Sequence, residues 1–339
     1  RIISNDNCTI LCKVEKGGVI SSRKGINIPY LPDSFPSLTT RDLQILEAIK
    51  DWDLDFLALS FVRGIKDILA LRNRIANFSR PFSIIAKIEK PQALNEIDEI
   101  IEASDGIMIA RGDLGVEVPV ESVPFWQKRI IFESRCRCKP VIVATQMLDS
   151  MIRNPIPTRA EVSDVAGAIY DGTDAIMLSG ETAIGDFPME SVQTASKIAR
   201  FTEYYADFVP DVQKIMVNNT DLSSAISFGA WEIARNLKLT VVVTSTYSGS
   251  TARRISRFRP NIPILAFSPQ YHILRLLKLS YGVFPFSVDL CTEPSKLIEE
   301  MKRLTLASRF GNKGDKIIIT AGVPLQKSGF TNFLQVEEL

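Results

Sequence analysis

The sequence predicts an α/β protein, and two observations support this prediction. Between residues 55 and 208, short apolar runs alternate with longer stretches of helical periodicity. Each run is continuously apolar and is followed by polar residues, as is typical of parallel strands that are buried on both faces. After a polar stretch that ends at Asp221 the alternation resumes, which predicts a second, smaller α/β domain.

The first part contains five predicted β/α units. Their strands begin between 23 and 35 residues apart, which is the size of one unit. The predicted strands are Phe56–Ser60, Ser83–Lys87, Gly106–Ala110, Val141–Thr145 and Ala175–Ser179. The predicted helices are Ile65–Phe78, Leu94–Ala103, Pro124–Cys138, Arg159–Tyr170 and Met189–Phe208. Such a series is typical of a doubly wound sheet or of a (β/α)8 TIM barrel, and the barrel needs three more units.

The residues before Asp55 do not predict these three units. They predict two short β segments, Thr9–Glu15 and Gly18–Ile28, followed by a helix that runs to about Lys50. Thr39 and Asp42 have the spacing of a capping box at the start of this helix. On the residues alone, a barrel would be incomplete.

The second domain is predicted from residue 222 onward. Its predicted helices are Leu222–Asn236, Thr251–Phe258, Tyr271–Lys278 and Pro294–Ser308. Its predicted strands are Thr240–Thr244, Pro263–Phe267, Val283–Ser287, Lys316–Ala321 and Asn332–Val336.

Charge and cysteine content exclude several classes of function. The 40 basic residues are balanced by 39 acidic ones, so we expect no nucleic acid and no membrane as partner. No apolar run approaches the roughly 18 residues of a membrane span. The chain opens at Arg1 without an initiator Met, so we expect its natural N-terminus, with any targeting segment, to precede this residue. The cysteines form neither a metal pattern nor a disulfide framework, which predicts reduced thiols in a reducing compartment: Cys8, Cys12, Cys136, Cys138 and Cys291.

Polar residues at the predicted strand ends form the candidate active site. In an α/β barrel these ends carry the catalytic groups. Lys87 and Glu89 alternate along one strand and therefore share a face. Asp113, after the next strand, adds a second carboxylate. Two carboxylates with open positions suit Mg²⁺ or Mn²⁺, and a lysine beside them suits a phosphoryl group in transit.

Simpler interpretations stay open for each of these residues. Lys87 and Glu89 could form only an ion pair, and Asp113 could cap the turn at Gly112. Thr145, at the end of the fourth strand, could be only a β-branched strand residue. Two further groups could be purely structural, since Glu181 could support its loop and Arg111 could brace one.

A hydroxyl-rich loop in the second domain is a candidate phosphate site. Thr246, Ser248, Gly249, Ser250 and Thr251 stand between a predicted strand and a predicted helix. Free backbone N–H groups, hydroxyl donors and the helix dipole favour an anion there. A Ser/Thr-rich helix cap is the alternative.

Six segments resemble pyruvate kinase motifs, in the order of that family and at plausible spacing. They are Ser60–Arg63, Lys87–Lys90, Ala110–Gly115, Ala144–Leu148, Pro157–Glu161 and Met177–Thr182. Residues 22–27 also resemble the family's return from its lid domain into the barrel. The resemblance covers essentially the whole chain. It implies a partial (β/α)8 TIM barrel, with its last five βα units, a remnant of a β lid and a C-terminal α/β domain. The domains would be residues 1–28, 29–208 and 209–339.

The resemblance also implies roles for single residues. Glu89 and Asp113 would hold Mg²⁺ (or Mn²⁺), and Lys87 would stabilise the phosphoryl group that passes from phosphoenolpyruvate to ADP. The backbone of Gly112 and Asp113 would receive the substrate carboxylate. Thr145 would organise the proton that converts the enolate to pyruvate, and Ser179 and Glu181 would support that proton relay.

The family's remaining properties are expectations of the same kind. They include ATP as product, K⁺, a sugar-phosphate or nucleotide effector at the hydroxyl loop, a homotetramer and a cytoplasmic location, or a plastid one if a transit peptide has been lost. In the family, three barrel strands and most of the lid precede the position where this chain begins. They carry an arginine, cation ligands and part of the nucleotide site, so we expect this chain alone not to turn over phosphoenolpyruvate. The alternatives are a catalytically incomplete paralogue that acts through assembly or effector binding, and another metal-dependent barrel enzyme.

Overall fold

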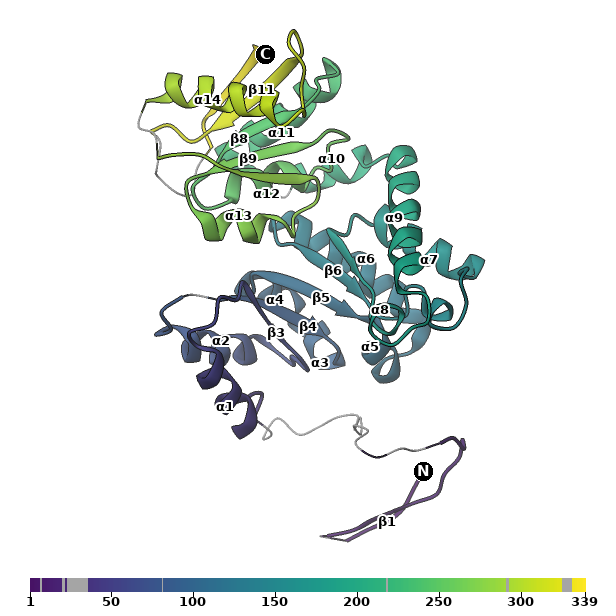
Figure 1. Ribbon diagram of the computed structural model, residues 1–339. Coiled ribbons are helices and arrows are strands. Elements are labelled where there is room, and N and C mark those ends of the chain that lie inside the picture. Colours follow the sequence, from purple (N-terminus) through teal and green to yellow (C-terminus); the bar gives the residue numbers. More distant parts are fainter. Residues whose placement is uncertain are drawn as a thin grey trace. The chain divides into compact units, whose positions relative to one another are not determined.

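The computed structural model of the chain describes residues 1–6, 8–19, 22, 36–80, 82–217, 219–290, 293–324 and 331–339 (Figure 1). It forms two compact units, residues 1–36 and 37–339.

The first unit contains an antiparallel hairpin of β1 (Ile2–Asn5) and β2 (Ile10–Cys12). The carboxylate of Asp6 accepts hydrogen bonds from the backbone N–H groups of Cys8 and Thr9, at 2.9 and 2.7 Å, and so shapes the turn. The prediction for this region was partly wrong. Only the middle of the predicted strand Thr9–Glu15 is a strand, and its partner Ile2–Asn5 was not predicted. Most of Gly18–Ile28 lies outside the described residues.

The second unit begins with five parallel strands in the order β3-β4-β5-β6-β7. They are β3 (Phe56–Leu59), β4 (Ser83–Ile88), β5 (Gly106–Ala110), β6 (Val141–Ala144) and β7 (Ala175–Met177). Spatial order follows sequence order without a reversal, which is the arrangement of a barrel segment and not of a doubly wound sheet. The predicted α/β class is confirmed.

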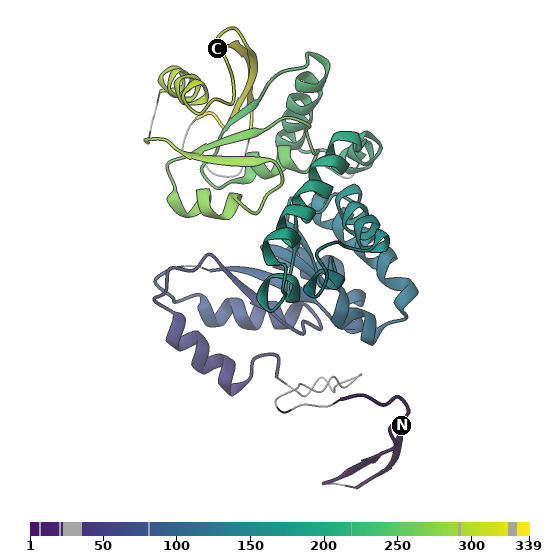
Figure 2. The same cartoon turned by 45° about the vertical axis from the view of Figure 1, so that its right-hand side comes forward.

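Helices cover one face of this sheet (Figures 1 and 2). The helices of this part are α1 (Thr40–Ile49), α2 (Ile65–Ile75), α3 (Pro91–Asn95), α4 (Ile97–Ala103), α5 (Arg111–Glu117), α6 (Val123–Cys136), α7 (Arg159–Tyr170), α8 (Gly180–Ala183) and α9 (Pro188–Tyr205), with short 3-10 turns at Val120–Ser122 and Asp149–Ile152. Two of them begin with a capping box: Thr39 with Asp42, as predicted, and Thr158 with Glu161, which was not predicted.

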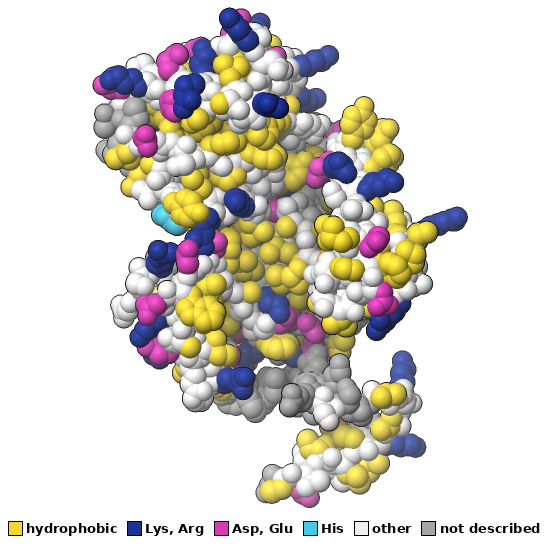
Figure 3. All heavy atoms as spheres, in the orientation of Figure 1, with side chains coloured by type: hydrophobic (Ala, Val, Ile, Leu, Met, Phe, Trp, Pro, Cys, Tyr) yellow, Lys and Arg dark blue, Asp and Glu magenta, His cyan; other side chains and the backbone are white. Residues whose placement is uncertain are grey.

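Strand alternation sends successive side chains to opposite faces of the sheet. Ile84, Ala86 and Ile88 pack against the helices in the main core. Ile85, Met108 and Ile142 form a smaller apolar cluster on the other face. In Figure 3, hydrophobic side chains gather where Figure 1 shows β5 and β6. Lys87 follows Ile85 by two positions, so it stands on this second face.

The second sheet has the order β10-β9-β8-β11-β12. Its strands are β8 (Val242–Ser245), β9 (Ile264–Ser268), β10 (Val283–Ser287), β11 (Lys316–Ala321) and β12 (Phe333–Glu338), of which only β12 runs antiparallel. Its helices are α10 (Val209–Val217), α11 (Leu222–Asn236), α12 (Ser250–Ser256), α13 (Tyr271–Leu277) and α14 (Pro294–Ala307). The strand that follows β8 in sequence, β9, lies on one side of it, and β11 lies on the other. The strand order therefore reverses between β8 and β11, which is a topological switch point.

The structure corrects two of the predicted segments, one near each sheet. The helix α10 lies where a polar segment between the domains was predicted. The predicted helix Leu94–Ala103 divides at Glu96 into α3 and α4. The domain boundaries after residues 28 and 208 stay predictions.

Candidate active site

Lys87 and Glu89 form an ion pair at the carboxyl end of β4. Lys87 Nζ lies 2.8 Å from Glu89 Oε1 and donates to Ser60 Oγ, also at 2.8 Å. The two side chains therefore lie close together, as their spacing predicts. They also form the ion pair that was the simpler interpretation. Ser60 follows β3, so the lysine bridges the ends of two neighbouring strands.

The Glu89 carboxylate is almost fully buried and is held by backbone. Its Oε2 accepts from the N–H of Phe61 at 2.6 Å. Phe61 has a φ of +55°, which is unusual for an aromatic residue. The bond to Glu89 offsets part of that strain, because a charged acceptor strengthens the hydrogen bond. Glu89 is thus fixed in position, as a ligand or a charge-positioning group has to be.

Gly112 and Asp113 lie in the first turn of α5, which begins directly after β5. The turn at Gly112, which was the simpler interpretation of Asp113, is the first turn of this helix. Asp113 is exposed. The helix orients backbone N–H groups of its first turn toward the carboxyl end of the sheet. One of them is in use, because Gly112 N donates to Thr145 Oγ1 at 2.7 Å.

Thr145 occupies a strained position at the end of β6. Its φ is +69°, and that of Gln146 is +53°. A left-handed backbone costs roughly 1–2 kcal/mol per non-glycine residue, and more for a β-branched one such as Thr145. The threonine hydroxyl donates to the carbonyl of Ala144 at 2.6 Å while it accepts from Gly112. Thr145 is therefore more than a strand residue, because the chain turns sharply to present its hydroxyl beside α5.

Arg111 holds this strained turn. Its Nη2 donates to the carbonyls of Thr145 and Gln146 at 2.9 and 3.2 Å, and its Nη1 pairs with Asp164 of α7 at 2.6 Å. The bracing role that the sequence left open for Arg111 is found. Nothing in the sequence pattern indicates Asp164 as its partner.

Glu181, in the short helix α8 after β7, supports the same edge of the sheet. The side chain is almost fully buried, and its two oxygens accept from the N–H groups of Leu148 and Ser179, at 3.0 and 2.7 Å. It therefore joins the loops after β6 and β7, in agreement with the structural interpretation. Ser179 is the residue that precedes α8.

The donor atoms of this edge suit a hard divalent cation. Glu89 and Asp113 offer carboxylate oxygens, which Mg²⁺ and Mn²⁺ prefer. In the described ranges, three or more His, Cys, Asp or Glu side chains do not gather into a metal-binding group anywhere. Glu89 and Asp113 are the two carboxylates of this edge that could contribute to a cation site.

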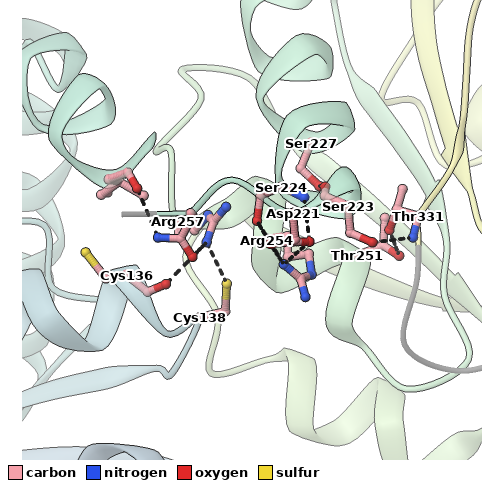
Figure 4. Close-up of polar contacts among 12 residues, drawn as sticks. Cys136, Cys138, Asp221, Ser223, Ser224, Ser227, Thr251, Arg254, Arg257 and Thr331 are labelled. Atoms are coloured by element: carbon pink, nitrogen blue, oxygen red, sulfur yellow. Dashed lines mark hydrogen bonds and ion pairs between the residues drawn. The ribbon is translucent and has the colours of Figure 1, made fainter. Parts of the chain in front are cut away.

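The hydroxyl loop of the second domain lies at the switch point between β8 and β11. Gly249 has a φ of +81°, which allows the turn into α12. Thr251 Oγ1 lies 2.8 Å from Thr331 Oγ1, so the segment after β11 meets the loop (Figure 4). The hydroxyl of Thr246 is buried without a hydrogen-bond partner. An oxyanion in the loop could accept a hydrogen bond from this hydroxyl.

Arg135 shows a role that the sequence did not predict. A basic residue in the last turn of a helix, as Arg135 is in α6, is expected to complement the helix dipole. Arg135 is instead fully buried, and its Nε and Nη2 donate to the carbonyl of Arg257, both at 3.2 Å, while Nη1 pairs with Asp211 at 3.0 Å. Burial lowers the pKa of its guanidinium to about 10. Arg135 thus ties α6 to the segment after α12.

Comparison with known proteins agrees with this arrangement. The family description "Pyruvate kinase, barrel domain" matches residues 2–192, and "Pyruvate kinase, alpha/beta domain" matches residues 224–337. The chain belongs to the pyruvate kinase family. A pyruvate kinase of Clostridium acetobutylicum is 42% identical over 336 residues, which are 98% of this chain and 71% of that protein. One of Thermotoga maritima is 40% identical over 335 residues, or 99% of this chain and 71% of its own length.

A solved structure gives the same result. A crystal structure of a pyruvate kinase from Cryptosporidium parvum superimposes with a TM-score of 0.85 at 34% identity. The alignment covers 92% of this chain and 64% of that one, so the chain spans about two thirds of the length of this pyruvate kinase. The resemblance stated from the motifs is confirmed over both domains. None of the helices in the described ranges is long and apolar enough to cross a membrane.

Proposed function

We propose that the complete gene product transfers the phosphoryl group of phosphoenolpyruvate to ADP and forms pyruvate and ATP, a step of glycolysis. The observation that supports this most is the Lys87–Glu89 pair, which Ser60 and the backbone of Phe61 hold in place. The exposed Asp113 follows the neighbouring strand β5. Pyruvate kinases are phosphotransferases, and phosphoryl transfer depends mostly on positioning and on charge stabilisation.

Glu89 and Asp113 are the residues that would hold Mg²⁺ or Mn²⁺. When bound, the ion supplies positive charge to the oxygens of the substrate. Lys87 lies 2.8 Å from Glu89, and its side chain is less buried than that of its partner, so its ammonium group can turn toward a phosphate. Glu89 would keep the hydrogen bond from the N–H of Phe61. A lysine in this position stabilises negative charge on the phosphoryl oxygens.

Thr145 and the first turn of α5 would orient the rest of the substrate. The N–H groups of Gly112 and Asp113 would bind the substrate carboxylate, and Gly112 would then give up its bond to the threonine hydroxyl. The hydroxyl of Thr145 is a poor acid by itself, so its task is to order a proton-carrying water next to the enolate carbon. Arg111 and Glu181 would keep the two loops still during this step, and Ser179 would support the proton relay.

The hydroxyl loop would bind the phosphate of a sugar-phosphate or nucleotide effector. Thr246, Ser248, Gly249, Ser250 and Thr251 are the proposed contacts. The buried hydroxyl of Thr246, which has no partner, and the left-handed Gly249 support this assignment. We further propose a dependence on K⁺, a homotetramer and a cytoplasmic location, all from family membership.

Two variants of the complete gene product test the catalytic assignment. Lys87→Met should suppress phosphoryl transfer, measured with lactate dehydrogenase coupling, and should leave proton exchange at the methyl group of pyruvate measurable. Thr145→Ala should reduce proton exchange more than it reduces phosphoryl transfer. The reverse pattern would overturn both roles.

A further inference from the structure

A second pocket lies at the opposite end of the first sheet from Lys87. Its volume is about 470 Å³, and it is lined by residues that begin β3 and β4, by the segment after α6 and by α12. Phe56 and Ser83 mark the amino ends of the strands. The basic residues in its wall are Arg137, Lys139, Arg253, Arg254 and Arg257.

Three of these cations have no carboxylate partner in the part of the chain that the structure describes. Lys139 donates only to the carbonyls of Glu102 and Ser104, at 3.1 and 2.7 Å. Arg253 donates to the carbonyl of Ser248 at 3.1 Å. Arg257 donates from Nη1 to neutral acceptors, the Cys136 carbonyl, the Cys138 sulfur and the Asn219 side chain.

The acidic residues in the wall are already paired. Asp221 accepts from Arg254 and caps α11, and Asp105 accepts from Arg72 and from the N–H of Ile84. Glu102 lies 3.8 Å from Arg137, and its side chain is three-quarters exposed. Within the described residues, Lys139, Arg253 and Arg257 therefore have no carboxylate at ion-pair distance, and Asp105 and Glu102 attract Lys139 only from further away.

Arg257 is the group that points most directly to a ligand. Only 2% of the residue is exposed, and its Nε and Nη2 have no hydrogen-bond acceptor. A buried donor without a partner costs free energy, and a buried cation without a counterion costs more. Burial also lowers the pKa of Lys139 and Arg253, so an added anion would stabilise their charged forms.

We propose that this pocket binds a small polyanion of the phosphorylated-metabolite class, with Lys139, Arg253 and Arg257 as its counterions. The site goes beyond the proposed effector loop. Figure 4 shows Arg257 directed toward Cys138, while Thr251 faces Thr331 in a separate group. Ser248 and Ser250, which belong to the hydroxyl loop, also line this pocket. An anion here would connect α12 with the amino ends of the first sheet, away from the candidate active site.

Calorimetric titration with inorganic pyrophosphate, without divalent cations, tests the proposal on the complete gene product. The wild type should bind the probe, and Lys139→Met should bind it roughly tenfold or more weakly, because a charge-assisted hydrogen bond is lost. Lys139→Arg should restore binding. Lys278→Met, which removes an exposed charge elsewhere, should bind the probe as the wild type does. Thr251→Val, which alters the proposed effector loop, should keep the binding that Lys139→Met loses.

Cys138 reports the location, because its sulfur lies 3.4 Å from Arg257 Nη1 and lines the pocket. Pyrophosphate should slow its alkylation by iodoacetamide, followed by peptide mass spectrometry, in the wild type and not in Lys139→Met. Absence of binding in the wild type, or equal binding in folded Lys139→Met, would overturn the proposal. Loss of binding in Thr251→Val alone would place the anion in the hydroxyl loop and would leave only the proposed effector site.

Discussion

Asp174 joins the two sheets of the large unit, and replacing it should loosen both. It lies just before β7, and its Oδ2 accepts from the N–H of Val141 at 3.0 Å. Its Oδ1 accepts from Arg259 Nη1 at 2.9 Å and from the N–H of Tyr281 at 3.0 Å. Arg259 follows α12, and both side chains of the ion pair are buried.

The expected cost of Asp174→Asn follows from this geometry. Removing one charge of a buried pair typically costs about 3–5 kcal/mol, because the other charge stays buried without a counterion. The Asn side chain keeps one carbonyl oxygen for a backbone N–H, so the low end, about 3 kcal/mol, is expected. By comparison, Asp186→Asn breaks an exposed pair with Arg153 and should cost about 1 kcal/mol or less.

Native-state hydrogen exchange measures both effects, because it follows the amides of β7 and α12 separately. About 3 kcal/mol corresponds to roughly hundredfold faster exchange of the most protected amides in Asp174→Asn. Asp186→Asn should leave them nearly unchanged. If folded Asp174→Asn exchanges no faster than Asp186→Asn, the buried pair does not hold the sheets together and the reasoning fails.

Three further predictions follow from the sites. Asp113→Ala in the complete gene product should lower the turnover rate by at least about two orders of magnitude, as expected for loss of an anionic metal ligand, and near-normal turnover with unchanged Mg²⁺ dependence would refute the assignment. Glu181→Gln should lower the thermal midpoint and slow proton exchange at pyruvate, because the amide nitrogen would face a buried N–H, whereas exposed Glu190→Gln should change neither. Burial raises the pKa of the Cys136 thiol to about 11, so little thiolate is present at pH 8. The rate of its alkylation should rise only as the pH approaches 11. Alkylation of Cys136 at pH 8 as fast as that of exposed Cys8 would contradict this prediction.

The sequence by itself determined the class of fold and the positions of most elements. Apolar runs locate buried parallel strands because both faces of such a strand avoid water, and this holds wherever the strand lies in the sheet. The start of a helix can also be set by local contacts. The side chains of Thr158 and Glu161 each accept a hydrogen bond from the backbone N–H of the other, so four residues decide where α7 begins. The ordered strand-end motifs also indicated the family before any contact was known.

The tertiary structure decided how the site is held. Arg111 and Glu181 act on residues more than thirty positions away, on the carbonyl of Thr145 and the N–H of Leu148. Local periodicity carries no information about such partners. The left-handed backbone of Thr145 was equally unpredictable, since the residue disfavours it and only the surrounding bonds stabilise it.

The same reason explains the links between the sheets. Arg135 is a basic residue near a helix end, where an exposed charge would favourably meet the helix dipole. It became a buried connector because the segment after α12 places the carbonyl of Arg257 against it. The pocket with Lys139 and Cys138 exists for the same reason, because its walls come from strands and helices that only folding brings together. Periodicity and capping are local and can be predicted from short stretches of sequence, whereas burial, pairing and strain depend on which distant groups the fold brings into contact.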